Sequence, residues 1–372
     1  MTPLPAVPLL DLTRQHAPLR DELRAAVERV LAAEAYVGGP EVEAFEAELA
    51  AWHGVPHGVG VANGTDAIVV ALRGLKIGPG DEVITTALSF FATAEAIATA
   101  GAAPVFCDVD PATANLDAAL LDGLVTERTR AIVPVHLYGQ PADMDAVGAV
   151  ARRHGLAVVE DCAQAIGAAW RGRRVGTFGD LACLSFYPSK NLGAFGDAGA
   201  VLARDPGLAR RCRVLANHGG ARKYEHEVVG LNSRLDALQA AVLRAKLPHL
   251  ERWTAERAAL AGLYRERLEG LPVERLATRN EAGHAHHLLV VRVPAGRDRV
   301  LADLRSRGVM ADIHYPQALP LVPALAALGH RPEDFPRAAD HAARCLTLPL
   351  FPGMRADEVE RVCSTLAECL AR

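Results

Sequence analysis

Lys190 is the residue whose type and position in the sequence best suit covalent chemistry. It lies just after an apolar run, in the segment Ser185-Phe-Tyr-Pro-Ser-Lys190, and three glycines follow within nine residues. Proline and glycine indicate a turn that can approach a ligand closely, and a lysine there can form a Schiff base with an aldehyde if its pKa is lowered. Most lysines are solvated surface residues, but this chain has only four lysines among its 40 Lys and Arg residues. The others are Lys76, Lys223 and Lys246.

A carboxylate and a potential anion site also follow apolar runs. Asp161 ends the run Ala157-Val-Val-Glu-Asp161, where it could face a pyridinium nitrogen or cap a helix. Asn63-Gly-Thr-Asp66 connects a predicted strand to a helix whose first N–H groups favour a phosphate, with the hydroxyls of Thr65 and Ser185 as further donors. Simple helix capping explains that tetrapeptide equally well. Pyridoxal 5'-phosphate (PLP) requires a lysine, a carboxylate and a phosphate cradle together.

Alternating strands and helices are the elements that must position these groups. Apolar runs predict strands at Gly58–Ala62, Glu82–Thr86, Ala103–Cys107, Ala131–Val135, Ala157–Glu160, Ala182–Ser185 and Ala198–Ala203. Helical patterns lie between most of them, for example at Asp66–Arg73 and Phe91–Ala100, and so predict a mostly parallel sheet. Because ligands gather at the carboxyl ends of such strands, we expect Asp161 and Lys190 to share one crevice.

The pattern changes in the last third of the chain. A helical pattern from Ser233 to Leu271 is interrupted only near Pro248. A predicted strand at His287–Val293 and helices at Arg297–Arg307 and Ala356–Ala371 follow. We therefore predict an α/β protein with a large domain, residues 1–248, and a small C-terminal α+β domain, residues 249–372.

Composition and missing motifs exclude several other classes. Half of the 372 residues are hydrophobic and 23% are charged, as in folded globular proteins, and the net charge of -4 argues against a nucleic-acid-binding face. The sequence contains no Walker loop, no Rossmann glycine pattern after a strand, no signal-peptide pattern and no apolar run long enough for a membrane span. Seven scattered cysteines without a C-x-x-C pair argue against zinc and disulfides. We expect a cytoplasmic protein without a bound metal.

Several ordered blocks of the sequence are similar to one enzyme family. They are Gly38-Gly-Pro40 with Phe45-Glu46, Asn63–Ala67, Ser89–Thr93, Pro134–Gly139, Glu160–Gln164, Ser185–Ala200, Gly230–Ala241, His314–Pro316 and Leu348-Pro349 with Phe351-Pro352. Through these blocks the chain resembles, nearly end to end, the PLP-dependent nucleotide-sugar aminotransferases of the DegT–StrS group. The resemblance implies the fold-type-I aminotransferase architecture, with a mostly parallel sheet in the large domain.

The resemblance implies a role for each matching residue. Lys190 matches the Schiff-base lysine, Asp161 the partner of the pyridine nitrogen and Gln164 the neighbour of the ring's phenolic oxygen. Phe90 matches the aromatic residue that stacks on the cofactor. The implied phosphate contacts are Gly64, Thr65, Ser185 and, from the neighbouring subunit, Asn232, and Asp66 is a further expected cofactor-binding residue. A homodimer with shared active sites is therefore expected, although Asn232 taken alone would be a helix N-cap.

Lysine at position 190 favours one reaction within this group. The resemblance implies that relatives with histidine there are deoxysugar dehydratases, whereas a lysine can shuttle protons during transamination. PLP would then alternate with its aminated form, pyridoxamine phosphate (PMP). Glutamate is the implied amino donor, and a keto-sugar is the acceptor.

The identity of the sugar is less determined. Lys223-Tyr-x-His226 before Gly230, together with Tyr187–Gly193, is most similar to members that aminate dTDP-linked 3-keto-6-deoxyhexoses, but members acting on 4-keto sugars or keto-cyclitols share much of this pattern. The expected substrate contacts are Tyr187, His218, Tyr224, Arg234, His314 and Tyr315, although each taken alone is more often a structural residue.

One segment departs from the pattern of the family. The family often has Pro-Leu-His after His314-Tyr-Pro316, whereas this chain has Gln317-Ala-Leu-Pro-Leu321. This difference leaves the identity of the sugar open. A PLP-dependent sugar dehydratase and a non-catalytic regulatory protein on the same fold are the remaining alternatives.

Overall fold

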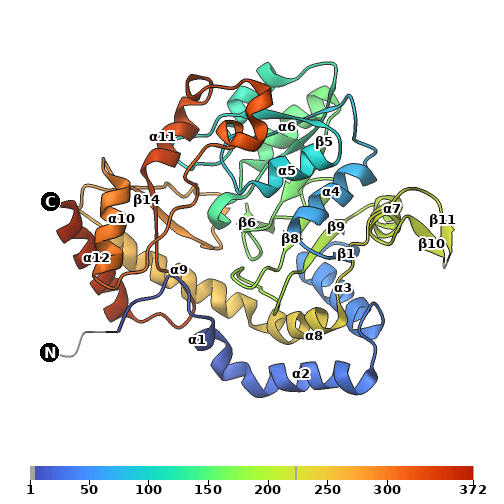
Figure 1. Cartoon of the computed structure of the whole chain (residues 1–372), viewed down its shortest axis with the longest axis horizontal. Helices are drawn as coiled ribbons and strands as arrows, with labels where there is room; N and C mark the ends of the chain where they lie inside the picture. Colours follow the sequence, from blue (N-terminus) through green and yellow to red (C-terminus); the bar gives the residue numbers. More distant parts are fainter. Residues whose placement is uncertain (1–4, 223, 372) are drawn as a thin grey trace.

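A seven-stranded sheet with strand order β1-β9-β8-β5-β4-β2-β3 forms the centre of the computed structural model (Figure 1). The structure describes residues 5–222 and 224–371, so Lys223 of the predicted substrate pattern lies outside the described residues. The strands are β1 (His57–Val61), β2 (Glu82–Thr86), β3 (Ala103–Cys107), β4 (Thr129–Val133), β5 (Ala157–Asp161), β8 (Leu181–Ser185) and β9 (Gly199–Ala203).

The directions of these strands bring most of their carboxyl ends to one edge. β8, β5, β4, β2 and β3 pair in parallel, whereas β9 is antiparallel to both of its neighbours, β1 and β8. β1 therefore runs in the same direction as the parallel strands. The loops that follow β1, β2, β4, β5 and β8 all leave the sheet at the same edge, where α/β sheets bind ligands.

Helices cover both faces of this sheet, which explains why its strands are almost continuously apolar. On one face of the sheet, α4, α5 and α7 pack on residues such as Val133. On the other face, α6 packs on Ile132, the residue that precedes Val133 in the chain. The helices α2, α3 and α8 cover that second face over β8 and β9. These helices are α2 (Arg20–Ala33), α3 (Pro40–His53), α4 (Gly64–Gly74), α5 (Ala92–Thr99), α6 (Met144–His154), α7 (Pro206–Ala216) and α8 (Ala237–Lys246).

The C-terminal part of the chain builds a further hydrophobic core around a three-stranded sheet of order β12-β14-β15. Its elements are β12 (Glu274–Arg275), β14 (Leu289–Arg292), β15 (Cys345–Leu348), α9 (Leu250–Arg267), α10 (Arg297–Ser306) and α12 (Ala356–Leu370). The N-terminal segment joins this core, since Val7 forms a parallel bridge with Val309, and it runs beside α12 in Figure 1. The domain boundary at residue 248 stays a prediction.

Short elements complete the described chain. The remaining helices are α1 (Leu12–His16), α11 (Pro336–Arg344) and the 3-10 turns Ala17–Leu19, Ala118–Leu124, Leu137–Gly139, Leu247–His249, Leu319–Leu321, Pro323–Leu328 and Pro332–Asp334. In a small sheet, β6 (Ala169–Trp170) pairs with β13 (Ala282–Gly283) on one side and with β7 (Arg173–Arg174) on the other. A hairpin of β10 (Gly220–Arg222) and β11 (Glu225–His226) extends from the right-hand end of the molecule in Figure 1.

The predicted elements agree with the structure except at particular ends. All seven predicted strands are present, but the fourth is Thr129–Val133, and beyond Pro134 only an isolated parallel bridge of Val135 with Asp161 continues it. The long C-terminal helical pattern begins at Ala237 and is divided by the 3-10 turn that contains Pro248. The predicted strand at His287 begins only at Leu289, because the N–H of His287 donates to Tyr138 instead of to a strand.

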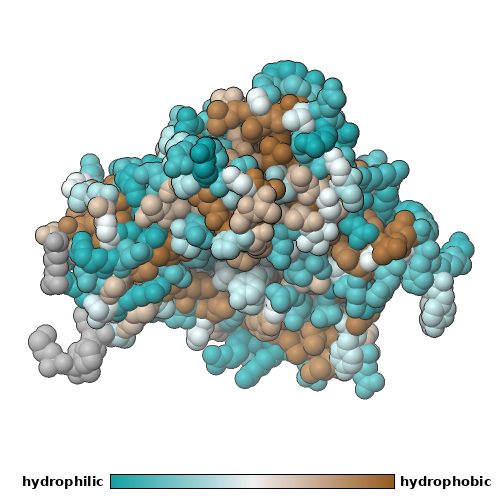
Figure 2. Space-filling model, turned by 45° about the horizontal axis from the view of Figure 1, so that its top comes forward, coloured by the Kyte–Doolittle hydropathy of each residue, from teal (hydrophilic) through white to brown (hydrophobic). Residues whose placement is uncertain are grey.

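Figure 2 shows hydrophobic patches separated by polar surface. Within residues 5–222 and 224–371, no helix combines the length and the apolar character that crossing a membrane requires. All seven cysteines are free thiols and are buried.

Candidate active site

A cavity of about 730 Å³ opens at the edge of the sheet where the carboxyl ends of the strands meet. The segments after β1, β2, β5 and β8 line one side, and the C-terminal core lines the other. Eleven of the predicted site residues line it: Gly64, Thr65, Asp66, Phe90, Asp161, Gln164, Ser185, Tyr187, Lys190, His314 and Tyr315. The fold therefore gathers residues that are up to 251 positions apart in the sequence.

Lys190 reaches this cavity from the loop that follows β8. Its backbone N–H donates to the carbonyl of Tyr187 at 2.8 Å, which closes a tight turn. Burial lowers the pKa of the Lys190 ammonium group from 10.5 to about 8, and the negative charge of Asp161 opposes part of this shift. A substantial fraction of the side chain is therefore a neutral amine near pH 8, and a neutral amine can attack an aldehyde or accept a proton.

Asp161 is the last residue of β5, and its side chain is buried at the cavity. Its Oδ2 accepts a hydrogen bond from the Thr93 hydroxyl at 2.8 Å, and its Oδ1 accepts one from the N–H of Ala163 at 3.1 Å. Burial raises the pKa of Asp161, whereas these hydrogen bonds and the charge of Lys190 act to lower it. Among the described residues no Lys, Arg or His forms an ion pair with this carboxylate, so it can accept a cationic ligand group.

The first turn of α4 forms a potential anion site on the cavity wall. Asn63 caps the helix, because its Oδ1 accepts from the N–H of Asp66 at 2.8 Å. In the described chain the N–H groups of Gly64 and Thr65 have no hydrogen-bond partner. A Cβ at Gly64 would lie 2.6 Å from the Cβ of Ser185, so only glycine brings the helix terminus this close to the Ser185 hydroxyl. These donors suit a phosphate.

Gln164 fixes the orientation of Tyr315 across the cavity. The Oε1 of Gln164 accepts from the backbone N–H of Tyr138 at 2.8 Å, so its Nε2 is the donor to the Tyr315 hydroxyl at 2.7 Å. Tyr138 holds a left-handed backbone with φ of 59°, which residues other than glycine rarely adopt. Phe90 is 56% exposed, with its ring centroid 5.8 Å from that of Tyr315. Two aromatic rings thus stand at the cavity, where a planar ligand could pack.

Four predicted residues lie away from the cavity. Asn232 and Arg234 are exposed, and His218 and Tyr224 belong to or flank the exposed hairpin of β10 and β11 (Figure 1). Within the part of the chain that the structure describes, none of the four lines the cavity of its own subunit. Their contribution to the site of a second subunit stays a prediction.

Sequence reasoning missed residues that support or line the cavity. Thr93 of α5 was recognised only within a matching block, and its hydroxyl lies 3.2 Å from that of Ser89, which precedes the helix. Asn191 ties the loop of Lys190 to the C-terminal segment, since its Nδ2 donates to the carbonyl of Ala285 at 2.8 Å and its Oδ1 lies 3.2 Å from Nδ1 of His287. His287 and Arg257 also line the cavity, and no local pattern indicated either.

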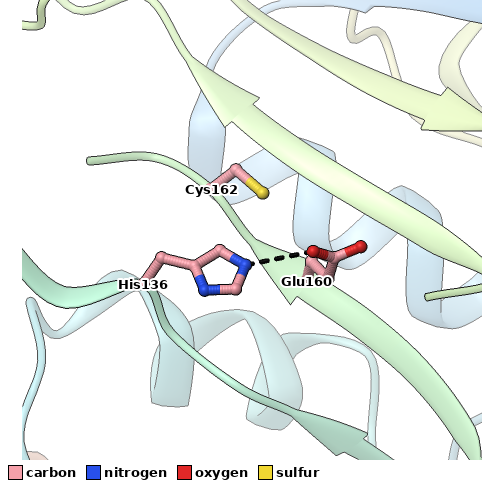
Figure 3. Close-up of side chains that lie close together, drawn as sticks. All are labelled: His136, Glu160 and Cys162. Atoms are coloured by element: carbon pink, nitrogen blue, oxygen red, sulfur yellow. Dashed lines mark hydrogen bonds and ion pairs between the residues drawn. The ribbon is translucent and has the colours of Figure 1, made fainter. Parts of the chain in front are cut away.

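The buried side chains of His136, Glu160 and Cys162 lie together beside the strand end that carries Asp161 (Figure 3). Their potential metal-ligand atoms lie within 4.8 Å of one another. However, Glu160 accepts hydrogen bonds from His136 Nε2 and from the N–H groups of Gly176, Phe178 and Gly179. His136 Nδ1 accepts from the N–H of Ala142. A metal ion would have to displace these bonds, so the geometry favours a role in bracing β5.

The donor set of the cavity fits PLP. The lysine amine matches the aldehyde, the buried carboxylate matches a protonated ring nitrogen, and the free N–H groups of Gly64 and Thr65 match the phosphate. An α/β sheet with these groups at the carboxyl ends of its strands is the fold and site of a PLP-dependent aminotransferase.

Comparisons with known proteins identify the family. Residues 18–367 match the DegT/DnrJ/EryC1/StrS aminotransferase family, and the chain belongs to it. The chain is 47% identical to the dTDP-3-amino-3,4,6-trideoxy-alpha-D-glucose transaminase of Streptomyces venezuelae, over 99% of this chain and 97% of that protein. It is 44% identical to the UDP-N-acetyl-3-dehydro-alpha-D-glucosamine 3-aminotransferase of Acidithiobacillus ferrooxidans, over 100% of each chain.

A solved structure agrees with these sequence comparisons. The X-ray crystal structure of S. venezuelae DesV in complex with a ketimine intermediate has a TM-score of 0.96 and 46% identity, and the match covers 99% of this chain and 100% of that chain. The predicted family, the α/β fold and the PLP-dependent aminotransferase class are therefore confirmed.

Proposed function

We propose that this protein transfers an amino group from glutamate to the C3 keto group of a dTDP-linked 6-deoxyhexose, in amino-sugar biosynthesis. The observation that carries the proposal is the pair Lys190 and Asp161 in one cavity of a chain that is 47% identical to a dTDP-3-amino-sugar transaminase. The UDP-linked relative is also named for an amine at C3. The two relatives thus agree on the position, although they differ in the nucleotide.

The predicted cofactor-binding residues of the cavity have separate roles in this proposal. Bound PLP supplies the electron sink that stabilises negative charge at the donor carbon and at the sugar carbon. Lys190 Nζ holds the cofactor between turnovers and carries the proton from the donor Cα. Asp161 keeps the ring nitrogen protonated. The first turn of α4 and Ser185 hold the phosphate end, and Phe90 and Gln164 hold the ring.

The substrate side of the cavity supports the binding of a sugar. His314 and Tyr315 line it from the C-terminal core, and Tyr187 lines it from the loop of Lys190. The Nδ1 of His314 lies 2.9 Å from the Thr347 hydroxyl, which fixes the orientation of its imidazole ring. Tyrosine and histidine side chains each carry a polar group on a ring. The polar group can hydrogen-bond to a sugar hydroxyl, and the side-chain ring can pack on the apolar face of the sugar.

A UDP-linked 3-keto sugar is the second candidate substrate, because a relative that is 44% identical over the full chain is named for one. The two relatives do not favour the 4-keto, keto-cyclitol or dehydratase alternatives, since both names place an amine at C3. Lysine at position 190 also favours transamination over dehydration.

A panel of keto-sugars tests the proposal. The purified enzyme with PLP and glutamate is expected to aminate dTDP-3-keto-6-deoxyhexose, with mass spectrometry recording the exchange of a keto oxygen for an amine. The 3-keto and 4-keto sugars on dTDP and UDP should be compared at equal concentration. Loss of water without gain of nitrogen would indicate a dehydratase, and turnover of only 4-keto sugars would contradict the assignment to C3.

The proposal includes a homodimer with shared active sites. Asn232 and Arg234 are exposed and do not line their own cavity in the described chain, and the nearby hairpin of β10 and β11 extends outward. The apolar side chains Val228 and Val229 on its return segment are 49% and 84% exposed, as expected of a segment that packs on another subunit. We also propose a cytoplasmic location, which the seven free thiols support.

Asn232→Ala is expected to lower PLP affinity about tenfold without dissociating the dimer, because a hydrogen bond to a charged phosphate is lost. Spectroscopic titration of the apo protein with PLP, with sedimentation as a check of the dimer, measures this effect. Asn217→Ala, at the other end of the Asn217–Asn232 bridge, is the matched control.

Mixing variant subunits separates a shared site from a local helix cap. If Asn232 serves the neighbour's cavity, a heterodimer of Asn232→Ala and Lys190→Ala subunits contains one intact site, so mixing restores wild-type PLP affinity at the site that keeps Lys190. If Asn232 acts only within its own subunit, every site that keeps Lys190 from the Asn232→Ala subunit retains the about tenfold weaker PLP affinity.

A further inference from the structure

Arg257 of α9 is a buried cation without a carboxylate partner among the described residues. It is 2% exposed, and its Nη1 donates to the carbonyls of His286, His287 and Leu350 at 3.0 to 3.4 Å. In the described chain, Nε and Nη2 have no hydrogen-bond partner. Burial of an arginine whose charge is not paired is costly, and it lowers the pKa of Arg257 to about 10.

This guanidinium group lines the active-site cavity on the side of the C-terminal core. His287 lines it as well, and the charges of Lys190, Arg257 and His314 join burial in holding the pKa of His287 well below its usual value. Within the described part of the C-terminal core, no aspartate or glutamate lines the cavity. This end of the cavity is therefore cationic and lacks a protein counter-ion.

The groups beside Arg257 are compatible with a carboxylate ligand. Leu350, whose carbonyl accepts from Nη1, lines the cavity with it, and Leu9, Leu10 and Leu348 are further apolar residues of the cavity wall. Nε has no accessible surface in this structure, so Nη2 is the part of the guanidinium group that a carboxylate in the cavity can reach. The other anions of the proposed reaction are the cofactor's phosphate, which the free N–H groups of the α4 terminus already suit, and the diphosphate of the sugar nucleotide. A diphosphate site at Arg257 would slow the half-reaction with the sugar nucleotide, whereas a carboxylate site would slow the half-reaction with glutamate.

We propose that Arg257 binds a carboxylate group of the amino donor. This assignment rests on the proposed function, since it gives the donor of that transamination a subsite. The sugar brings no carboxylate to the second half-reaction in that proposal. Arg257 therefore distinguishes between the two substrates that use the same cavity in turn, and it favours dicarboxylic or other amino acids over neutral amines.

Binding of an unreactive dicarboxylate tests the subsite without turnover. The PLP-loaded enzyme is expected to bind glutarate in calorimetric titration but not the neutral diamide of the same length. Arg257→Gln is expected to weaken glutarate binding 10- to 100-fold, as for loss of about one charge-assisted hydrogen bond, and Arg257→Lys to weaken it less. Arg292→Gln is the matched control, because Arg292 also has a buried Nε without a partner but does not line the cavity.

The two half-reactions separate a carboxylate subsite from a structural brace. In Arg257→Lys or Arg257→Gln, whichever folds with the melting temperature nearer to wild type, the bleaching of the visible band by glutamate should slow at least tenfold. The reverse reaction with the amino-sugar nucleotide should stay within about twofold. Equal slowing of both, equal glutarate affinity in variant and wild type, or no glutarate binding by the wild type would overturn the proposal. Failure of the wild type to react with any amino donor would instead contradict the proposed function.

Discussion

Lys190→Ala is expected to lower the rate of transamination by about four orders of magnitude or more and to leave the fold intact. In the proposed reaction Lys190 Nζ both holds PLP and moves the proton, so alanine removes two functions at once. The fold should survive, because the Lys190 side chain makes no hydrogen bond with the described residues and its burial opposes its own charge. The melting temperature of the apo variant should equal or exceed that of the wild type.

Absorbance spectroscopy tests the predicted effect of Lys190→Ala directly. The wild type should show the visible band of bound PLP, and glutamate should bleach it, whereas Lys190→Ala should show neither. Lys76→Ala is the matched control, because Lys76 is an exposed lysine outside the cavity. A Lys190→Ala protein that completed the glutamate half-reaction at the normal rate would refute the role of this lysine.

The pKa of Lys190 adds a second measurable consequence. Only the neutral amine attacks the aldehyde of PLP, and the pKa of Lys190 is lowered to about 8. The rate of PLP uptake by the apo enzyme should therefore rise about tenfold per pH unit below pH 8 and level off above it. For a solvated lysine, with a pKa near 10.5, the rise would continue through pH 10.

Local sequence patterns predicted the sheet well because each strand is a buried apolar run. Val133 and Ile132 face opposite helical layers, so the run reads as continuous rather than alternating. The same patterns do not indicate the direction of a strand. The antiparallel orientation of β9 is known only from its pairing with β1 and β8 in the structure. Nor did they show that Val7 pairs with Val309, because that contact depends on how the N-terminal segment packs on a distant core.

The residues of the candidate site also fall into two groups, those that the sequence indicated and those that it did not. Asp161 and Lys190 follow apolar runs, so their meeting at one sheet edge could be expected from topology. Gln164 and Phe90 became candidates only through the family resemblance. Arg257 and His287 were missed, since they reach the cavity only because α9 and the segment before β14 pack against the edge of the central sheet. Long-range packing of that kind leaves no periodicity in the sequence.

Asp161→Asn is expected to lower kcat by about two to four orders of magnitude while the variant still binds PLP. The carboxylate holds the ring nitrogen in its protonated form, and a neutral amide cannot balance that positive charge in a buried site. The Thr93 hydroxyl and the N–H of Ala163 already donate to the two oxygens, so the carboxylate is held in place before the cofactor binds. Thr93→Val removes one of these donors and should lower kcat only about tenfold.

The Asp161→Asn variant also decides between the catalytic role of Asp161 and the helix-capping role that its sequence position permits. Asparagine accepts hydrogen bonds from backbone N–H groups as well as aspartate does, so the bond from Ala163 should persist in Asp161→Asn. If Asp161 acted only as a cap, the variant would keep nearly normal kcat and melting temperature. If the charge itself is required, stability should change little and both half-reactions should slow together, because each passes through negative charge on the same ring. Single-turnover rates with glutamate and with the amino-sugar nucleotide, measured beside the melting temperature, separate these outcomes.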